Sequence, residues 1–212
     1  MERYRDRTEA GRELATAFGD RDWVRPLVLA VPRGGVPVGA VVATALGGDL
    51  DVVVARKVGA PGNPELAIGA VGAEGDPYLD RGLMSRLGVT DEWVEREVAR
   101  QVEEVRRREA AYRGDRPPPA VAGRAVVVVD DGVATGATLR AALVSVRAAG
   151  PAELWCGVPV GPPATIADLR AFADGVVCPR QPPYFMAVGE WYRDFRQVGD
   201  DEVRAILDEH RG

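Results

Sequence analysis

Short apolar segments with the character of strands alternate along the chain with segments whose apolar residues recur at helical spacing. The clearest strand is Val126–Val129, a run of valines typical of a strand buried on both faces of a parallel sheet. This alternation predicts an α/β fold with an open parallel sheet flanked by helices. Strands are expected at 27–31, 52–56, 67–71, 124–130, 153–158 and 176–178, and helices at 8–18, 36–46, 140–149, 164–173 and 201–210.

A further helix is predicted over residues 91–112, which place apolar and charged residues on opposite faces. Its acidic side chains precede basic ones by four residues, which favours ion pairs on a solvated face. A stretch rich in proline and glycine then leads back into the core. We therefore expect residues 80–122 to be an insertion that packs on the domain or pairs subunits.

The composition narrows the class of protein. A chain of 212 residues with a net charge of −5 is expected to form a single domain over residues 1–212, without a nucleic-acid-binding surface. The charged start and the absence of a long apolar run predict a cytoplasmic protein with no membrane partner. Cys156 and Cys178 lie in apolar segments and are expected to be packing residues. His210 is the only histidine, which excludes histidine triads and multi-histidine zinc sites.

The segment 126–139 joins a strand to a loop that is suited to an anion. Asp130 and Asp131 stand where the strand ends, and Gly132–Thr138 supplies glycines, small residues and hydroxyls before the helical pattern resumes. The first amides of a helix lack internal partners and the helix dipole is positive there, so the loop can bind a phosphate. The carboxylates would repel that phosphate unless they face sugar hydroxyls or a bridging divalent cation. Simple capping of the helix by Asp131 or Thr138 would not explain the paired acids.

These residues resemble the type I phosphoribosyltransferases, in which a strand, two acidic residues and a TGxT loop bind phosphoribosyl pyrophosphate. The resemblance implies that Asp130 and Asp131 hold the ribose 2- and 3-hydroxyls and that the loop binds the 5-phosphate. It also implies the fold of that family, with a helical insertion and a small C-terminal hood at about residues 179–199. The loop residues that match the family are Gly132, Ala134, Thr135, Gly136, Ala137 and Thr138.

A second loop, Pro32–Gly35, follows the strand predicted at 27–31 and precedes a helix. Parallel strands end at the same edge of a sheet, so this loop is expected to face the first one. Arg33 offers a fixed charge and a fork of donors that suit phosphate. Alone, such a loop would equally fit a turn beside a surface arginine. In the family a similar loop, often with a cis peptide, binds the pyrophosphate, and Arg33, Gly34 and Gly35 match it.

Lys57 is the only lysine in the chain and follows Arg56 at the end of the strand predicted at 52–56. Genome composition explains why every other basic residue except the histidine is arginine. A lysine kept at this position nevertheless indicates a site that needs a compact ammonium group. In the family an RK pair opens a flexible loop that closes over the pyrophosphate. By this resemblance Arg56 and Lys57 bind pyrophosphate, residues 59–64 form a lid, and Glu65 is a candidate acid or base.

The stretch 182–198 is the most aromatic part of the chain, and core packing is one explanation for it. It also resembles the end of the purine phosphoribosyltransferases, where an aromatic side chain stacks on the base. The resemblance makes Tyr184 or Phe185 the base-stacking candidate, Trp191 a wall or core residue, and Arg193 a pyrophosphate contact.

One departure from the family bears on the acceptor. The 6-oxopurine enzymes carry an acidic residue immediately before the TG of the phosphate loop, where this chain has Ala134. A methyl group cannot accept a proton, which disfavours hypoxanthine and guanine. Adenine, orotate, uracil and acceptors outside the standard bases remain open.

Together these features predict an enzyme that moves the ribose 5-phosphate of phosphoribosyl pyrophosphate to a nitrogen acceptor such as a nucleobase and releases pyrophosphate. Mg²⁺ is the expected cofactor, held through the substrate with Asp130 or Asp131. The expected catalytic residues are Asp130, Asp131, Arg33 and Lys57, because they would stabilise charge on the sugar and the leaving group. The resemblance also implies a homodimer.

Two other functions fit parts of the sequence. The family includes regulators that sense phosphoribosyl pyrophosphate without catalysis, and such a sensor is the main alternative. The acidic balance and the presence of both Arg33 and Lys57 argue against it. A dinucleotide-dependent reductase is disfavoured because no GxGxxG follows a first strand.

Overall fold

The parallel sheet predicted from the sequence is the centre of the fold. The computed structural model describes residues 2–19, 21–73 and 77–210, without the side chains of Pro64 and Glu65. The strands run parallel in the order β2-β1-β6-β7-β8. They are β1 (Leu27–Ala30), β2 (Asp49–Val52), β6 (Ala125–Val129), β7 (Glu153–Gly157) and β8 (Gly175–Val177).

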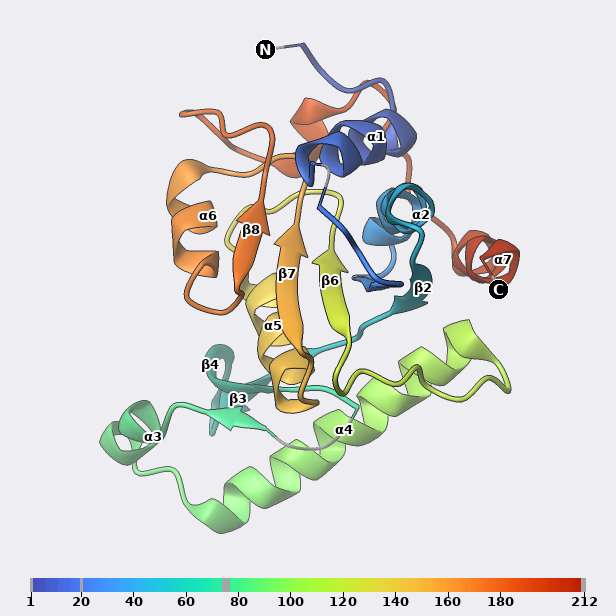
Figure 1. Ribbon diagram of the computed structural model, residues 1–212. Helices are drawn as coiled ribbons and strands as arrows, with labels where there is room; N and C mark the ends of the chain where they lie inside the picture. The colour runs from blue at the N-terminus through green and yellow to red at the C-terminus, as the bar shows by residue number, and fades with distance from the viewer. Residues whose placement is uncertain (1, 20, 74–76, 211–212) are drawn as a thin grey trace.

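Helices cover both faces of this sheet (Figure 1). Successive side chains of a strand point to opposite faces, so each face of the sheet carries an apolar layer. In β6, Val127 and Val129 belong to the core on one face, whereas Val126 and Val128 belong to the core on the other. One face packs against α1 (Arg7–Ala17), α2 (Gly35–Leu46) and α7 (Asp200–Glu209), and the other against α5 (Ala137–Ala148) and α6 (Pro163–Leu169).

The winding of the chain reverses between β1 and β6, which are neighbours in the sheet. From β1 the chain passes through α2 to β2 on one side, whereas β6 leads through α5 to β7 on the other. Such a switch point opens a crevice at the carboxyl ends of the two strands. In Figure 1 the arrows of β6, β7 and β8 point toward α1, and α4 lies across the opposite side of the molecule.

A second, antiparallel sheet was not predicted. It consists of β3 (Arg56–Ala60), β4 (Asn63–Val71) and β5 (Tyr78–Leu79) in the order β3-β4-β5. It packs against α3 (Arg81–Leu87) and α4 (Asp91–Arg113), so the helices of the expected 80–122 insertion pack on the domain.

One local expectation was wrong. The strand predicted at 52–56 lies instead at Asp49–Val52, and Val53 and Val54 form a buried connection between the two sheets. The segment 59–64, predicted to form a lid, is the end of a β-hairpin in which Ala60 pairs with Asn63. Its turn is Pro61-Gly62, where Gly62 has a positive φ of 72°.

The C-terminal half of α4 holds the connection between the sheets through a buried ionic network. Glu109 accepts a hydrogen bond of 3.0 Å from the backbone N–H of Val54 and one of 2.6 Å from Arg113. Arg113 also donates to Asp51 at 2.9 Å and to the carbonyl of Val52 at 2.9 Å. Burial raises the pKa of Glu109, while the charge of Arg113 opposes that rise.

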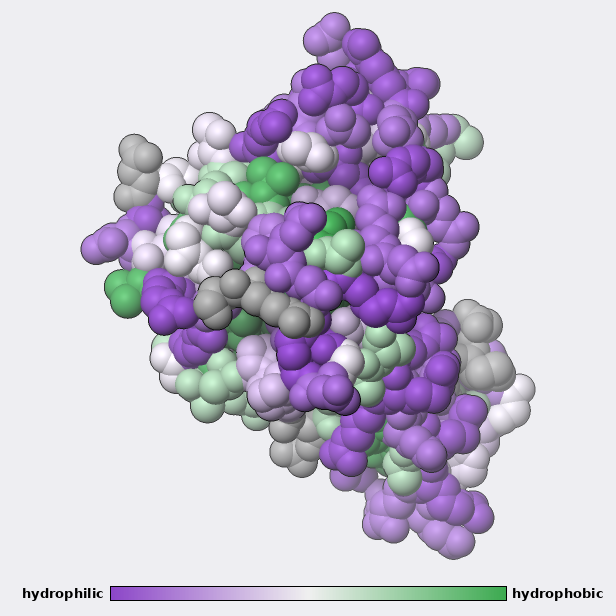
Figure 2. Space-filling view, turned by 90° about the vertical axis from the view of Figure 1, so that its right-hand side faces the viewer, coloured by the Kyte–Doolittle hydropathy of each residue, from purple (hydrophilic) through white to green (hydrophobic). Residues whose placement is uncertain are grey.

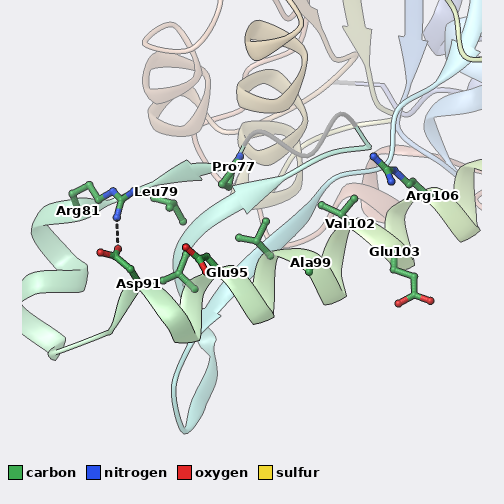
Figure 3. A pocket seen from close by; sticks show the side chains of 11 residues that line it. Pro77, Leu79, Arg81, Asp91, Glu95, Ala99, Val102, Glu103 and Arg106 are labelled. Carbon is green, nitrogen blue, oxygen red and sulfur yellow. Dashed lines mark hydrogen bonds and ion pairs between the residues drawn. The ribbon is translucent and has the colours of Figure 1, made fainter.

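One large hollow lies away from the switch point. It has a volume of about 800 Å³ and opens between α4 and β5 (Figure 3). Apolar residues of α4 line its floor, and the ion pair between Arg81 and Asp91 stands at one end.

Hydrophilic side chains dominate the face shown in Figure 2, with small apolar patches between them. Over the part of the chain that the structure describes, no helix is both long enough and apolar enough to cross a bilayer.

Replacing Arg113 with methionine should lower the free energy of unfolding by about 3 to 5 kcal/mol, since Glu109 and Asp51 would lose their buried cation. Urea unfolding monitored by circular dichroism measures the change. Arg107→Met is the matched control, because Arg107 pairs with Glu104 on the exposed side of the same helix. Equal losses in the two variants would contradict a structural role for the buried network.

Candidate active site

The loop between β6 and α5 has the geometry of an anion cradle. Its last residue, Gly136, has a positive φ of 76° and is the N-cap of α5, with no side-chain capping bond. The helix therefore starts at Ala137, earlier than the predicted residue 140, and Thr138 lies in its first turn. Ala134 and Thr135 of the loop and Ala137 and Thr138 of the first helical turn are exposed. The free amides of the first turn are thus open to an anion from solvent.

The loop between β1 and α2 also leads from a strand into the N-terminus of a helix, although the N–H of Gly35 donates to the carbonyl of Val31 at 3.0 Å. The Pro32–Arg33 peptide is cis, and Gly35 begins α2 directly after it. Gly34 is the N-cap of that helix, again without a side-chain capping bond. The Arg33 guanidinium is partly exposed and lies 3.5 Å from the carboxylate of Asp200 in α7.

The two loops touch, as the sequence predicted. A Cβ atom on Gly34 would lie 2.7 Å from Cγ of Asp131 and closer still to its Oδ2. A Cβ on Gly35 would lie 2.8 Å from the carbonyl oxygen of Val129. Only glycine lets the backbone of one loop approach the carboxylate and backbone of the other this closely.

The paired acids stand in an environment that resists their ionisation. Burial and the adjacent Asp131 carboxylate raise the pKa of Asp130 well above its ordinary value. Burial also raises the pKa of Asp131, and the charge of Arg7 partly offsets that rise. Asp130 accepts a hydrogen bond of 2.8 Å from the backbone N–H of Asp131, which fixes its orientation. Ionisation of both acids would be favoured by donors or a cation from a ligand.

Two residues at this site were missed by the sequence reasoning. Arg7 forms an ion pair of 2.8 Å with Asp131, and the hydroxyl of Tyr192 donates to the carbonyl of Asp131 at 2.5 Å. In the sequence Tyr192 is one of several aromatic residues in the segment 182–198, and Arg7 is one of many arginines. No local pattern distinguishes either residue, because both contacts join distant parts of the chain.

Arg56 and Lys57 face the phosphate loop from the second sheet. They share a hollow of about 280 Å³ with Ala137 and Thr138 at the start of α5. Arg56 is held by a hydrogen bond of 2.5 Å to Gln101 of α4, whereas Lys57 is exposed. The side chain of Glu65 lies outside the described part of the structure.

The aromatic C-terminal segment is placed beside the acids by the short helix η1 (Val188–Trp191). A Cβ on Gly132 would lie 2.6 Å from Val188, so this helix packs directly behind the acid pair. Phe185 and Trp191 stack with their rings 9° from parallel, while Tyr184 is 90% exposed. Arg193 is exposed and lies 3.9 Å from Glu2. The structure therefore brings η1 to the acids, whereas the described contacts of Arg193 are with Tyr4 and Glu2.

The doubly wound sheet, with glycine-rich loops and acids at its switch point, is the architecture of an α/β protein that binds a phosphorylated ligand. The family model of the phosphoribosyl transferase domain matches residues 7–190, so the chain belongs to this family of pentosyltransferases.

Individual relatives agree with this assignment. A Mycobacterium tuberculosis protein named provisionally as a phosphoribosyl transferase, found in strains CDC 1551 and H37Rv, is 42% identical over 208 residues, which is 98% of this chain and 47% of that protein. The chain thus spans about half the length of the curated relatives it matches. The crystal structure of TT1426 from Thermus thermophilus is 49% identical, with a TM-score of 0.89 over 99% of this chain and 100% of that one.

Gly34→Ala should cost about 1 to 3 kcal/mol of folding free energy, because the new methyl group would displace the Asp131 carboxylate. Chemical denaturation measures the loss. Gly199→Ala is the control, since a Cβ there meets nothing within 4 Å. A Gly34→Ala variant as stable as the control would show that the close approach is not required.

Asp130→Asn should change how stability depends on pH. A carboxyl whose pKa is raised by folding contributes stability below its ordinary pKa, and that contribution is lost as pH rises through the folded-state pKa. Asparagine cannot ionise, so the variant should gain stability relative to the parent as pH rises from about 4 to 8.

Asp174→Asn serves as the opposite control for this pH series. A hydrogen bond from Arg147 lowers the pKa of Asp174, so removing its charge should cost stability at neutral pH. Urea unfolding across the pH series gives both curves. Parallel curves for the parent and Asp130→Asn would refute the raised pKa.

Proposed function

We propose that this domain transfers the ribose 5-phosphate of phosphoribosyl pyrophosphate to a nitrogen acceptor, a nucleobase by preference, and releases pyrophosphate. The observation that carries the proposal is the contact between the two loops, in which Asp131 lies against Gly34. A ligand with phosphate at each end and a diol between them would engage both loops and the acids at once. Phosphoribosyl pyrophosphate has that arrangement.

The ribose 5-phosphate end would be bound by backbone amides of Ala134–Thr138 and by the hydroxyls of Thr135 and Thr138. Asp130 and Asp131 would accept hydrogen bonds from the ribose 2- and 3-hydroxyls. Two anionic acceptors next to the sugar would also favour the positive charge that develops at C1 as the bond to pyrophosphate breaks.

The pyrophosphate end would lie on the second loop. The amide of Gly34 and the side chain of Arg33 would hold it, and Lys57 with Arg56 would approach from the hairpin. These cations would stabilise the negative charge on the departing group. Arg33 would have to exchange its ion pair with Asp200 for the ligand. Arg193 stays a predicted contact.

The acid pair suits a magnesium ion that is shared with the substrate. Mg²⁺ prefers carboxylate and phosphate oxygens and keeps several waters, so one or two carboxylates suffice. Among the described residues no cluster of three or more metal-ligating side chains exists, which fits an ion brought largely by the substrate. When bound, the ion would neutralise charge on the diphosphate, with Asp130 or Asp131 as the protein ligand.

The acceptor would enter between the phosphate loop and the aromatic segment. The exposed Tyr184 and the stacked pair of Phe185 and Trp191 are the candidates to contact a flat ring. Ala134 supplies no base, and its carbonyl is engaged by the hydroxyl of Thr165 at 2.8 Å. An acceptor whose nitrogen is nucleophilic without a base at this position is therefore preferred over hypoxanthine or guanine.

The test is pyrophosphate release from phosphoribosyl pyrophosphate and Mg²⁺ across purines, pyrimidines and small amines. We expect release that depends on one acceptor and falls at least about 100-fold in an Asp130→Asn, Asp131→Asn double variant. Asp91→Asn, on the distant helix α4, is the control for loss of a carboxylate and should keep full activity.

Two other outcomes would argue against the proposal. Tight binding of phosphoribosyl pyrophosphate with no release for any acceptor would favour a sensor. Release that persists unchanged in the folded double variant would remove the acids from the mechanism.

A further inference from the structure

Arg7 is the first residue of α1, yet its side chain reaches the acid pair at the end of β6. Its Nε and Nη2 atoms both lie 2.8 Å from the same carboxylate oxygen of Asp131, Oδ2. The two side chains are only 10% and 12% exposed. This ion pair is therefore shielded from water and more strongly directional than a surface pair.

The Arg7 guanidinium is itself fixed by the C-terminal segment. Its Nη1 donates to the carbonyl of Arg196 at 2.9 Å, and its Cζ lies 4.2 Å from the ring centroid of Phe195. The next aromatic, Tyr192, donates to the backbone carbonyl of Asp131. One arginine thus joins the N-terminal helix, the aromatic segment and the acid in a single cluster.

The cluster determines which oxygen of Asp131 is open to a ligand. Oδ2 receives both nitrogens of Arg7 and is also the oxygen nearest Gly34. Its second oxygen, Oδ1, is the atom left for another donor. A carboxylate held in this way presents one acceptor in one direction.

We propose that Arg7 is a positioning residue that holds Asp131 so that Oδ1 accepts a hydrogen bond from the sugar diol of the ligand. The inference rests on the proposed function, because it assigns the diol to Asp131. Arg7 acts through Asp131 and does not need to contact the sugar. Its loss should weaken recognition of the sugar more than recognition of the phosphate.

Arg180 provides the matched control. It stacks 3.6 Å from the ring centroid of Tyr4 and donates to Glu13 at 2.8 Å, so it also ties the N-terminal helix to the C-terminal part of the chain. Over the described residues, its side-chain hydrogen bonds and ion pairs go to Glu2 and Glu13 and none reaches Asp130 or Asp131. The Arg180→Gln variant therefore controls for the loss of an arginine that only links these two parts of the chain.

The experiment compares binding of ribose 5-phosphate with binding of inorganic phosphate by calorimetry. The parent should prefer ribose 5-phosphate, and Arg7→Gln should lose about tenfold of that preference while its affinity for inorganic phosphate stays the same. Arg7→Lys should recover part of the preference, and Arg180→Gln should retain all of it. In an Asp131→Asn background, Arg7→Gln should have no further effect on the preference.

Several results would overturn the inference. An unchanged preference in folded Arg7→Gln would do so, as would an equal loss in Arg180→Gln or a full additional loss in the Asp131→Asn background. If Arg7→Gln does not fold, the Arg7→Lys variant with and without Asp131→Asn gives the same comparison. Failure of the parent to bind either phosphoribosyl pyrophosphate or ribose 5-phosphate would instead refute the proposed function.

Discussion

The close approach of two loops across the switch point is the constraint on which the site depends. Gly34 has no side chain, and the space this leaves is taken by the carboxylate of Asp131. The contact needs the β1 and β6 strands to be neighbours, their helices to leave on opposite faces, and both loops to be short. The order of strands in the sheet, more than any single residue, brings the anion loops together.

Holding two carboxylates at this point opposes stability. Asp130 is half-buried beside the Asp131 carboxylate, and desolvation together with that charge raises its pKa. The charge of Arg7 offsets part of this effect at both acids, although its hydrogen bonds go to Asp131 alone of the two. Natural sites commonly retain such unfavourable groups because a ligand supplies the missing charge or donors.

The sequence predicted the parallel strands other than β2, the helices around them and the two loops, because periodicity and strand ends are local signals. The valines of β6 and the glycines after Arg33 carry this information by themselves. The antiparallel sheet was not predicted, because its Pro61-Gly62 turn has the same composition as a flexible loop. The contact between Arg7 and Asp131 was not predicted either, because the two residues are 124 positions apart in the sequence and meet only through tertiary packing.

The buried network at the end of α4 also governs how the hairpin can move. Glu109 and Arg113 hold the backbone of Val52 and Val54, and Gln101 on the same helix holds Arg56. Breaking buried hydrogen bonds of this kind is costly, so the start of the hairpin and α4 should behave as one rigid unit. The same network fixes α4 to β2 of the central sheet, so any movement that carries Lys57 toward a ligand has to come from bending of the hairpin beyond Arg56.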